Sequence, residues 1–185
     1  MKEKFNFSLL KHLIMKFLFL AVFSVVLFSC GNTFYVVRHA EKVKMPAGAM
    51  EANDPPLSDS GNLRAITLKD ELKGKNIRYI FSTGYKRTIA TAKPLDEYLL
   101  NVQTQIYNPK KDSMDAFYQK MKAIKKGNVL IIGHSNTVDD IANALAGKTV
   151  VDGDLKETDY DNIFIIKRKG KKMNFKGITY GAPTE

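Results

Sequence analysis

The segment FYVVRHAEK, residues 34–42, begins as an apolar run, and its second half carries an arginine, a histidine and a glutamate. Its first four residues are aromatic or β-branched, which is typical of a buried strand. Arg38, His39 and Glu41 do not suit a strand interior, because burying a charge is costly unless it is paired. The segment therefore predicts a strand that delivers reactive side chains to an edge of a sheet.

The rest of the chain alternates predicted strands with predicted helices. Further strands are expected at 77–81, 102–107 and 128–133, and two more within NIFIIKRKGKKMNFKGITY, residues 162–180, around a basic turn. Helices are expected from Ser58 or Ser60 to Leu72, over 85–100 with a break or second start at Pro94, over 113–125, and over 138–145. This alternation predicts an α/β fold, a three-layer α/β/α sandwich whose mostly parallel central sheet carries an antiparallel edge.

Polar side chains follow three of the predicted strands. Arg38 and His39 follow the first strand, Arg87 comes shortly after the second, and His134 follows a later one. The chain has three histidines, and the remaining one, His12, lies in the predicted leader. Because ligands bind at the carboxyl ends of the strands in open α/β sheets, we expect His39 and His134 to meet at one edge.

Two histidines and two arginines at one sheet edge suit phosphoryl transfer. A guanidinium is a planar fork that matches two phosphate oxygens. An imidazole has a free pKa of about 6.5, so its neutral form is available as a nucleophile near pH 7. Neighbouring positive charge favours that neutral form. A second imidazole can donate hydrogen bonds to the charge that develops on the transferring group.

Four segments of the chain carry a resemblance to a known family. They are VVRHAEK, DPPLSDSGNLRA, FSTGYKRTIATA and IIGHSNTV, and they occur in this order between residue 33 and about residue 146. Together they resemble the motifs of the histidine phosphatase superfamily, the phosphoglycerate mutase-like proteins, in its short SixA-like bacterial branch. The resemblance implies the phosphoglycerate mutase-like fold and a reaction that needs no metal or other cofactor.

The same resemblance implies a role for each matching residue. His39 corresponds to the nucleophile that takes the phosphoryl group as a phosphohistidine. Arg38 and Arg87 correspond to clamps on the phosphate, and His134 corresponds to the second imidazole, which binds phosphate and stabilises charge. Asn136 is expected to cap the last helix, with substrate binding as the alternative.

The chain departs from the family's pattern at the acid that protonates the leaving group. Many family members place a glutamate after the third strand, where this chain reads IYNPKKDS. Asp54, in the loop 43–57, is the preferred candidate for the acid, and a turn before the prolines is its alternative role. Glu41 is the second candidate, with orientation of Arg38 as its alternative role. The missing glutamate argues against a mutase and favours a phosphatase with a limited range of substrates.

The first thirty residues predict a lipoprotein signal peptide. Phe17 to Phe28 reads FLFLAVFSVVLF, which is short for a membrane span and typical of the apolar part of a signal peptide. LFSC, residues 27–30, resembles the bacterial lipobox, so we expect residues 1–29 to be removed and Cys30 to be lipidated. An ordinary secretory signal or an uncleaved anchor helix is the alternative. The prediction places the phosphatase domain, residues 30–185, in the cell envelope, anchored by lipid to a bacterial membrane and facing the periplasm or the exterior.

The chain is basic, with a net charge of +10. This excess suits an anionic partner, such as a phosphate ester, a nucleic acid or a membrane. No aromatic-basic motif of the common nucleic-acid-binding modules is present, so no nucleic-acid partner is expected. The basic stretch KRKGKKMNFK, residues 167–176, is expected to form a solvated hairpin turn, with contact to anionic lipid or an acidic substrate as the alternative.

The sequence therefore predicts a phosphatase that hydrolyses phosphate monoesters of small molecules through a phosphohistidine on His39. Dephosphorylation of phosphohistidine proteins is one alternative, although that activity belongs in the cytoplasm and the signal peptide directs the chain elsewhere. A module that binds phosphorylated ligands without turnover is the other alternative. Since Cys30 is the only cysteine, no disulfide within the chain and no cysteine-based metal site is expected.

Overall fold

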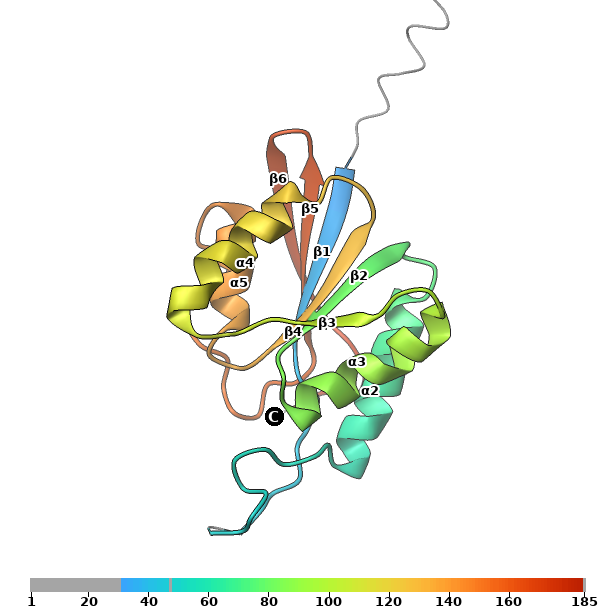
Figure 1. Ribbon diagram of the computed structural model, residues 1–185, viewed down its shortest axis with the longest axis vertical. Helices are drawn as coiled ribbons and strands as arrows, with labels where there is room; N and C mark the ends of the chain where they lie inside the picture. Colours follow the sequence, from blue (N-terminus) through green and yellow to red (C-terminus); the bar gives the residue numbers. More distant parts are fainter. Residues whose placement is uncertain (1–30, 47, 185) are drawn as a thin grey trace, which may run out of the picture. The chain divides into compact units, whose positions relative to one another are not determined.

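Six strands form a single sheet in the order β3-β2-β4-β1-β5-β6 (Figure 1). In this computed structural model, which describes residues 31–46 and 48–184, the strands are β1 (Gly31–Arg38), β2 (Ile77–Ser82), β3 (Thr104–Ile106), β4 (Asn128–Gly133), β5 (Asn162–Lys169) and β6 (Lys172–Thr179). Strands β1 to β4 are parallel, whereas β5 is antiparallel to β1 and β6 is antiparallel to β5. The predicted signal peptide and the predicted lipidation of Cys30 lie outside the described residues.

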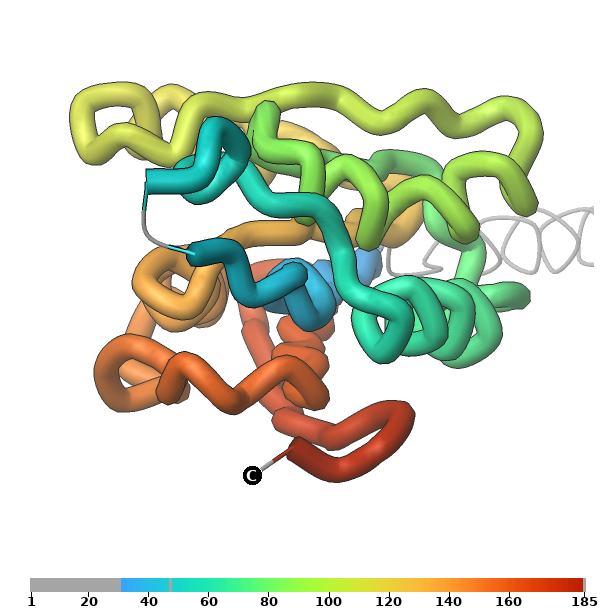
Figure 2. The backbone as a smooth tube through the Cα atoms, turned by 90° about the horizontal axis from the view of Figure 1, so that it is seen from below, coloured from blue at the N-terminus to red at the C-terminus, as the bar shows by residue number. Residues whose placement is uncertain are grey.

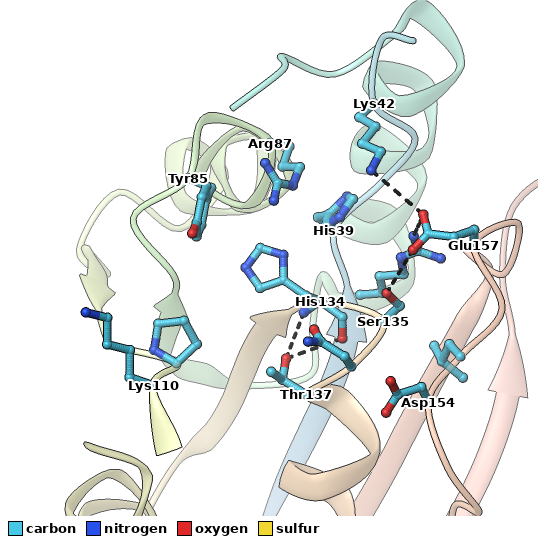
Figure 3. A pocket seen from close by; sticks show the side chains of 14 residues that line it. His39, Lys42, Tyr85, Arg87, Lys110, His134, Ser135, Thr137, Asp154 and Glu157 are labelled. Carbon is cyan, nitrogen blue, oxygen red and sulfur yellow. Dashed lines mark hydrogen bonds and ion pairs between the residues drawn. The ribbon is translucent and has the colours of Figure 1, made fainter. Parts of the chain in front are cut away.

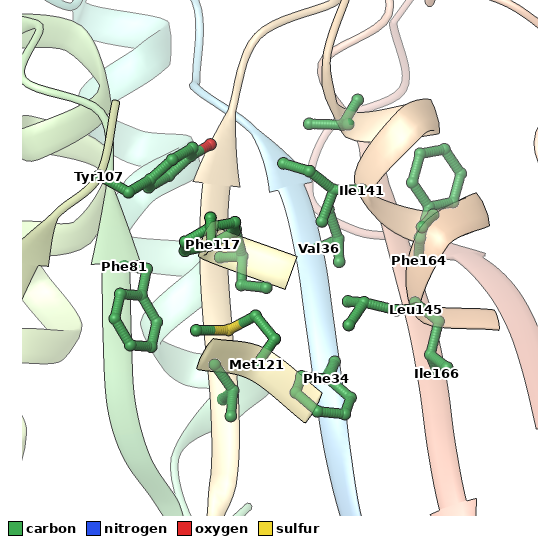
Figure 4. Close-up of a cluster of buried hydrophobic side chains, with 14 of the residues drawn as sticks. Phe34, Val36, Phe81, Tyr107, Phe117, Met121, Ile141, Leu145, Phe164 and Ile166 are labelled. Carbon is green, nitrogen blue, oxygen red and sulfur yellow. The ribbon is translucent and has the colours of Figure 1, made fainter. Parts of the chain in front are cut away.

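Four helices cover the two faces of this sheet within the described residues, and they are α2 (Asp59–Leu72), α3 (Lys86–Leu99), α4 (Lys111–Ala123) and α5 (Val138–Ala146). Helices α2 and α3 lie on one face, and α4 and α5 lie on the other (Figure 1). Successive side chains of a strand point to opposite faces. Val37 of β1 therefore packs with Leu68 and Leu95, whereas Val36 packs with Met121 in the cluster drawn in Figure 4. The predicted three-layer α/β/α sandwich with an antiparallel edge is confirmed.

Helix α3 differs from its prediction at Pro94, because the helix continues through this residue without a break. A proline removes one backbone donor from a helix interior, which costs about 3 kcal/mol. The same helix buries Ala92 before the proline and Leu95 after it. Packing of these side chains against the sheet outweighs the local cost, so tertiary contacts keep the helix continuous.

Two further expectations at the ends of elements are resolved by the structure. Of the two candidate caps for α2, Ser58 is the N-cap, and its Oγ accepts a hydrogen bond from the Gly61 amide at 3.2 Å. The third strand, expected over 102–107, is only three residues long. None of the helices formed by residues 31–46 and 48–184 is long and apolar enough to cross a membrane.

The pairing of β1 with β4 positions the two histidines. Arg38 lies opposite Gly133 in the parallel register, and the His39 amide donates to the carbonyl oxygen of Gly133 at 2.9 Å. His39 and His134 therefore leave the sheet from neighbouring strands at the same level. Figure 2 looks at the molecule from below and shows the teal segment before α2 in front of the sheet.

Candidate active site

The imidazoles of His39 and His134 lie together at the carboxyl edge of the sheet (Figure 3). Their ring centroids are 5.5 Å apart and their planes are inclined at 66°. A hydrogen bond to a phosphate oxygen needs a separation of about 2.9 Å. The two rings are therefore close enough to contact a single phosphoryl group.

His39 is held in one tautomer by the backbone. Its Nδ1 lies 2.7 Å from the carbonyl oxygen of Ala40. A carbonyl oxygen only accepts hydrogen bonds, so Nδ1 carries the proton and Nε2 keeps its lone pair. The amide of Ala40 in turn donates to Thr91 Oγ1 of α3 at 3.0 Å, which fixes the peptide that orients the ring.

Burial and neighbouring cations keep both imidazoles neutral. Burial, followed by the positive charges of Arg38 and Arg87, lowers the pKa of His39 from 6.5 to about 3. Burial, followed by the charges of Arg87 and Arg38, lowers the pKa of His134 from 6.5 to about 4. Both rings are therefore uncharged at pH 7, which is the form that a nucleophilic imidazole requires.

Thr83 orients the second imidazole from the end of β2. Its Oγ1 lies 2.9 Å from His134 Nε2 and 2.9 Å from Thr88 Oγ1, and both threonines are fully buried. The amide of His134 donates to Thr137 Oγ1 at 3.0 Å. The contact between Thr83 and His134 joins residues 51 positions apart, so no local sequence pattern predicts it.

Arg38 is buried and is fixed by the loop that precedes β5. Its Nη1 donates to the carbonyl oxygens of Lys156 at 2.7 Å and Asp159 at 3.1 Å, and its Nη2 lies 3.1 Å from Glu157 Oε2. The guanidinium lies 4.1 Å from the centre of the Tyr160 ring. The Nε of Arg38 is buried and has no acceptor among the described residues. This N–H is therefore a buried donor without a partner among those residues, on a residue that lines the cavity described below.

Arg87 reaches the same space from the first turn of α3 (Figure 3). Its Nη1 lies 3.4 Å from Asp54 Oδ1, and its guanidinium lies 4.5 Å from the centre of the Tyr85 ring. Its Nε is also buried, with no acceptor in the part of the chain that the structure describes. Arg38 and Arg87 thus each present a buried, unsatisfied N–H next to two neutral imidazoles, which suits the binding of one oxyanion.

One cavity of about 500 Å³ contains these groups, and its lining consists of Arg38, His39, Lys42, Tyr85, Arg87, Pro109, Lys110, His134, Ser135, Asn136, Thr137, Asp154, Leu155 and Glu157. The structure therefore brings together five of the predicted residues, namely Arg38, His39, Arg87, His134 and Asn136. The two predicted acids, Asp54 and Glu41, do not line this cavity.

The two predicted acids make other contacts. Glu41 pairs with Arg64, whose Nε lies 2.9 Å from each of the two carboxylate oxygens. Asp54 Oδ1 accepts a hydrogen bond from the Lys86 amide at 2.9 Å, and it faces Arg87. Glu41 therefore anchors α2, and Asp54 joins the loop 43–57 to the start of α3.

Two carboxylates that sequence reasoning missed, Asp154 and Glu157, line the cavity. Glu157 lies 3.1 Å from Arg38 and 3.8 Å from Lys42, so it is Glu157 rather than Glu41 that pairs with Arg38. Burial alone would raise the pKa of Glu157, but the charges of Arg38 and Lys42 hold it below its usual range. In residues 31–46 and 48–184, no group of three or more His, Cys, Asp or Glu is placed to hold a metal ion.

Asn136 does not cap the last helix. The N-cap of α5 is Thr137, because the helix begins one residue later than the capping prediction requires. That prediction is therefore wrong. Asn136 instead lines the cavity, and its role in substrate binding stays a prediction.

Residues 34–107 match the family model of the histidine phosphatase superfamily, branch 1. This segment contains Arg38, His39 and Arg87. Over these residues the chain is similar to members of that superfamily.

Solved structures with the same fold include a phosphatase and a mutase. SixA from Agrobacterium tumefaciens superposes with a TM-score of 0.60 at 16% identity, covering 82% of this chain and 97% of its own. The protein histidine phosphatase SixA complexed with tungstate gives 0.60 at 15% identity, covering 80% and 96%. Phosphoglycerate mutase from Bacillus anthracis gives 0.54 at 15% identity, covering 81% and 93%. These identities establish the fold alone, and no curated protein matches the chain.

Proposed function

We propose that this protein is a phosphatase that hydrolyses phosphate monoesters through a phosphohistidine on His39. One observation carries the proposal. The neutral rings of His39 and His134 lie 5.5 Å apart, and Arg38 and Arg87, whose Nε groups are buried and unsatisfied, line the same cavity. A phosphoryl group supplies the acceptors that these donors lack, at the position that the nucleophile can reach.

The reaction has two steps. In the first step, Nε2 of His39 attacks phosphorus, a nitrogen–phosphorus bond forms, and the bond from phosphorus to the leaving oxygen breaks. Arg38, Arg87 and His134 donate hydrogen bonds to the non-bridging oxygens, which lowers the energy of the charge on the transferring group. In the second step, water attacks the phosphohistidine, inorganic phosphate leaves, and His39 returns to its neutral form.

The environment of the leaving group favours substrates that need little protonation. Glu157 is held as a carboxylate by Arg38 and Lys42, and the segment after β3 contributes Pro109 and Lys110 to the cavity. Phenolates and the imidazole of a phosphohistidine are leaving groups of this kind. The same feature supports a second candidate function, the SixA-like dephosphorylation of phosphohistidine proteins.

A series of aryl phosphates tests this proposal on the full chain purified in detergent. We expect kcat/KM to fall steeply, by roughly tenfold for each one to two units of leaving-group pKa, because the leaving group departs without a proton in the proposed mechanism. His39→Ala is the matched control, and a chelator should leave the rate unchanged. A rate that does not depend on the leaving group would contradict the limited substrate range.

The three candidate functions give different outcomes in one further assay. Turnover of sugar phosphates supports the monoesterase, whereas turnover confined to a phosphohistidine peptide supports the SixA-like reaction. Tight binding of a phosphate ester with no release of inorganic phosphate would overturn both and leave a binding module. Trapping of acid-labile phosphate in the wild type, and not in His39→Ala, identifies the nucleophile.

A further inference from the structure

The amino ends of the parallel strands form an edge of the sheet opposite the candidate active site. β1 begins at this edge, where Gly31 pairs with Lys169 of β5. β1 spans eight residues, so at about 3.3 Å per residue this edge lies roughly 25 Å from His39. In the sequence, Gly31 follows the apolar run at residues 17–28 almost directly. The chain therefore joins the domain at the end farthest from the cavity.

Six exposed lysines lie on the turns of this amino edge, and we call them the lysine rim. They are Lys75 in the α2–β2 turn, Lys125 and Lys126 in the α4–β4 turn, and Lys169, Lys171 and Lys172 at the β5–β6 turn. The β5–β6 turn lies beside the start of β1, at the top of Figure 1. No lysine of the rim forms an ion pair within the described part of the chain.

Hydrogen bonds hold these turns together against the start of β1. Asn128 accepts a hydrogen bond from the Thr33 amide at 2.7 Å and donates to the carbonyl oxygen of Lys75 at 2.5 Å. The buried side chain of Arg168, in β5, donates to the carbonyl oxygen of Lys122 in the last turn of α4 at 3.0 Å. The lysine rim is therefore a patch of fixed geometry, because each turn is tied to its neighbour.

The acidic residues next to the rim do not cancel its charge. Asp70 and Glu71 lie in the last turn of α2, which precedes the α2–β2 turn. Asp70 is already paired with Lys73 at 2.9 Å and Lys69 at 3.4 Å. The six lysines of the rim thus form a surface with a strong excess of positive charge.

We propose that the lysine rim binds the anionic surface of a membrane. The position of Gly31 and the charge of the rim point to the same occupant, since an apolar segment predicted to attach to a membrane joins the domain at the cationic edge. Basic residues near an anionic bilayer strengthen a membrane anchor that is marginal alone. In this orientation the candidate active site faces away from the bilayer and is open to soluble phosphorylated substrates. The proposal does not depend on which phosphate compound the protein hydrolyses.

Hydrogen–deuterium exchange of the full chain on lipid vesicles tests the proposal. Phosphatidylcholine vesicles are compared with vesicles that also contain phosphatidylglycerol. We expect exchange at the turns of the rim to slow at least about fivefold on the anionic vesicles, because one lysine raises the binding constant for such a surface about fivefold and the bound turns are shielded from solvent. Addition of ~0.5 M salt should reverse the protection, because it screens exposed charges.

Two triple variants with the same loss of charge make the test specific. The rim variant is Lys169→Gln/Lys171→Gln/Lys172→Gln, and the control on α3 and α4 is Lys93→Gln/Lys111→Gln/Lys120→Gln. The rim variant should lose the protection and the control should keep it, while both retain aryl phosphatase activity. Equal protection on neutral and anionic vesicles, or equal loss in both variants, would overturn the proposal. Protection that appears without vesicles and grows with protein concentration would overturn it in favour of a second copy of the chain.

Discussion

The two ends of the sheet both carry positive charge, but the charge is held differently at each end. At the carboxyl edge, the side chains of Arg38 and Arg87 are 2% and 12% exposed, and contacts on several sides fix their planes. At the amino edge, the lysine rim is exposed on turns. A buried guanidinium binds one oxyanion in a defined geometry, whereas exposed ammonium groups act together through a field that salt screens. The comparison shows that burial of the cationic groups, rather than their number, distinguishes a binding site for one oxyanion from a charged surface.

Removal of the nucleophile is expected to have the largest effect. His39→Ala should reduce kcat for an aryl phosphate by at least ~10⁴-fold, because it removes the imidazole that forms the covalent intermediate in the proposed mechanism. The rim variant should keep the wild-type rate. Steady-state kinetics measure both, and circular dichroism checks that each variant is folded. If the His39→Ala protein retained a tenth of the activity, the carboxyl edge would not be the site of catalysis.

A pair of arginine variants compares the two edges directly. Arg87→Ala should reduce kcat/KM by about 10²-fold, because it removes a donor aimed at the transferring phosphoryl group. Arg78→Ala is the matched control, since Arg78 is exposed on β2 and its Nε bonds only to Asn76. Equal losses in the two variants would mean that Arg87 acts through general charge, and not through contact with phosphate.

Arg168 tests whether a buried arginine at the amino edge has a structural role. It donates to carbonyl oxygens at the end of α4, at Lys122 and Ile124. Arg168→Gln should lower the free energy of unfolding by about 1.5–3 kcal/mol, because hydrogen bonds from a charged group are lost. Urea denaturation measures this loss, and kcat of the folded variant should be unchanged. A large fall in kcat without loss of stability would contradict this structural role, because it would mean that Arg168 affects catalysis at the opposite edge of the sheet.

The pH dependence of stability reports on the burial of the two imidazoles at the carboxyl edge. The pKa of His39 is about 3 and that of His134 is about 4 in the folded protein, against 6.5 for an unperturbed histidine. As the pH drops, the two histidines become protonated in the unfolded chain at a higher pH than in the folded protein. The free energy of unfolding should therefore fall as the pH drops from 6.5 towards 4. Urea titrations across this range should give a shallower slope for His39→Gln/His134→Gln. An identical slope in the double variant would contradict the lowered pKa values.

Several features of the site could be predicted because their signal is local. Each histidine directly follows an apolar strand, so the rule for the carboxyl ends of parallel strands applies to both. The contacts that hold Arg38 could not be predicted, because Glu157 lies 119 positions away, in a loop without a motif. Glu41 was assigned near Arg38 on sequence proximity, but its partner is Arg64 on α2, 23 positions away. A break at Pro94 was predicted from the free energy that a proline costs in a helix interior. The packing of α3 against the sheet outweighs that cost, and the helix is continuous.

The sequence by itself determined the elements, the edge at which the histidines lie, and the residue types available for phosphate chemistry. These follow from side-chain periodicity and from backbone preferences that act over a few residues. Only the tertiary structure decided which carboxylate meets which guanidinium, that Thr83 orients His134, and that Gly31 lies beside the lysine rim. Those contacts depend on the order of strands in the sheet and on the paths of loops, which are set by packing between segments far apart in the chain.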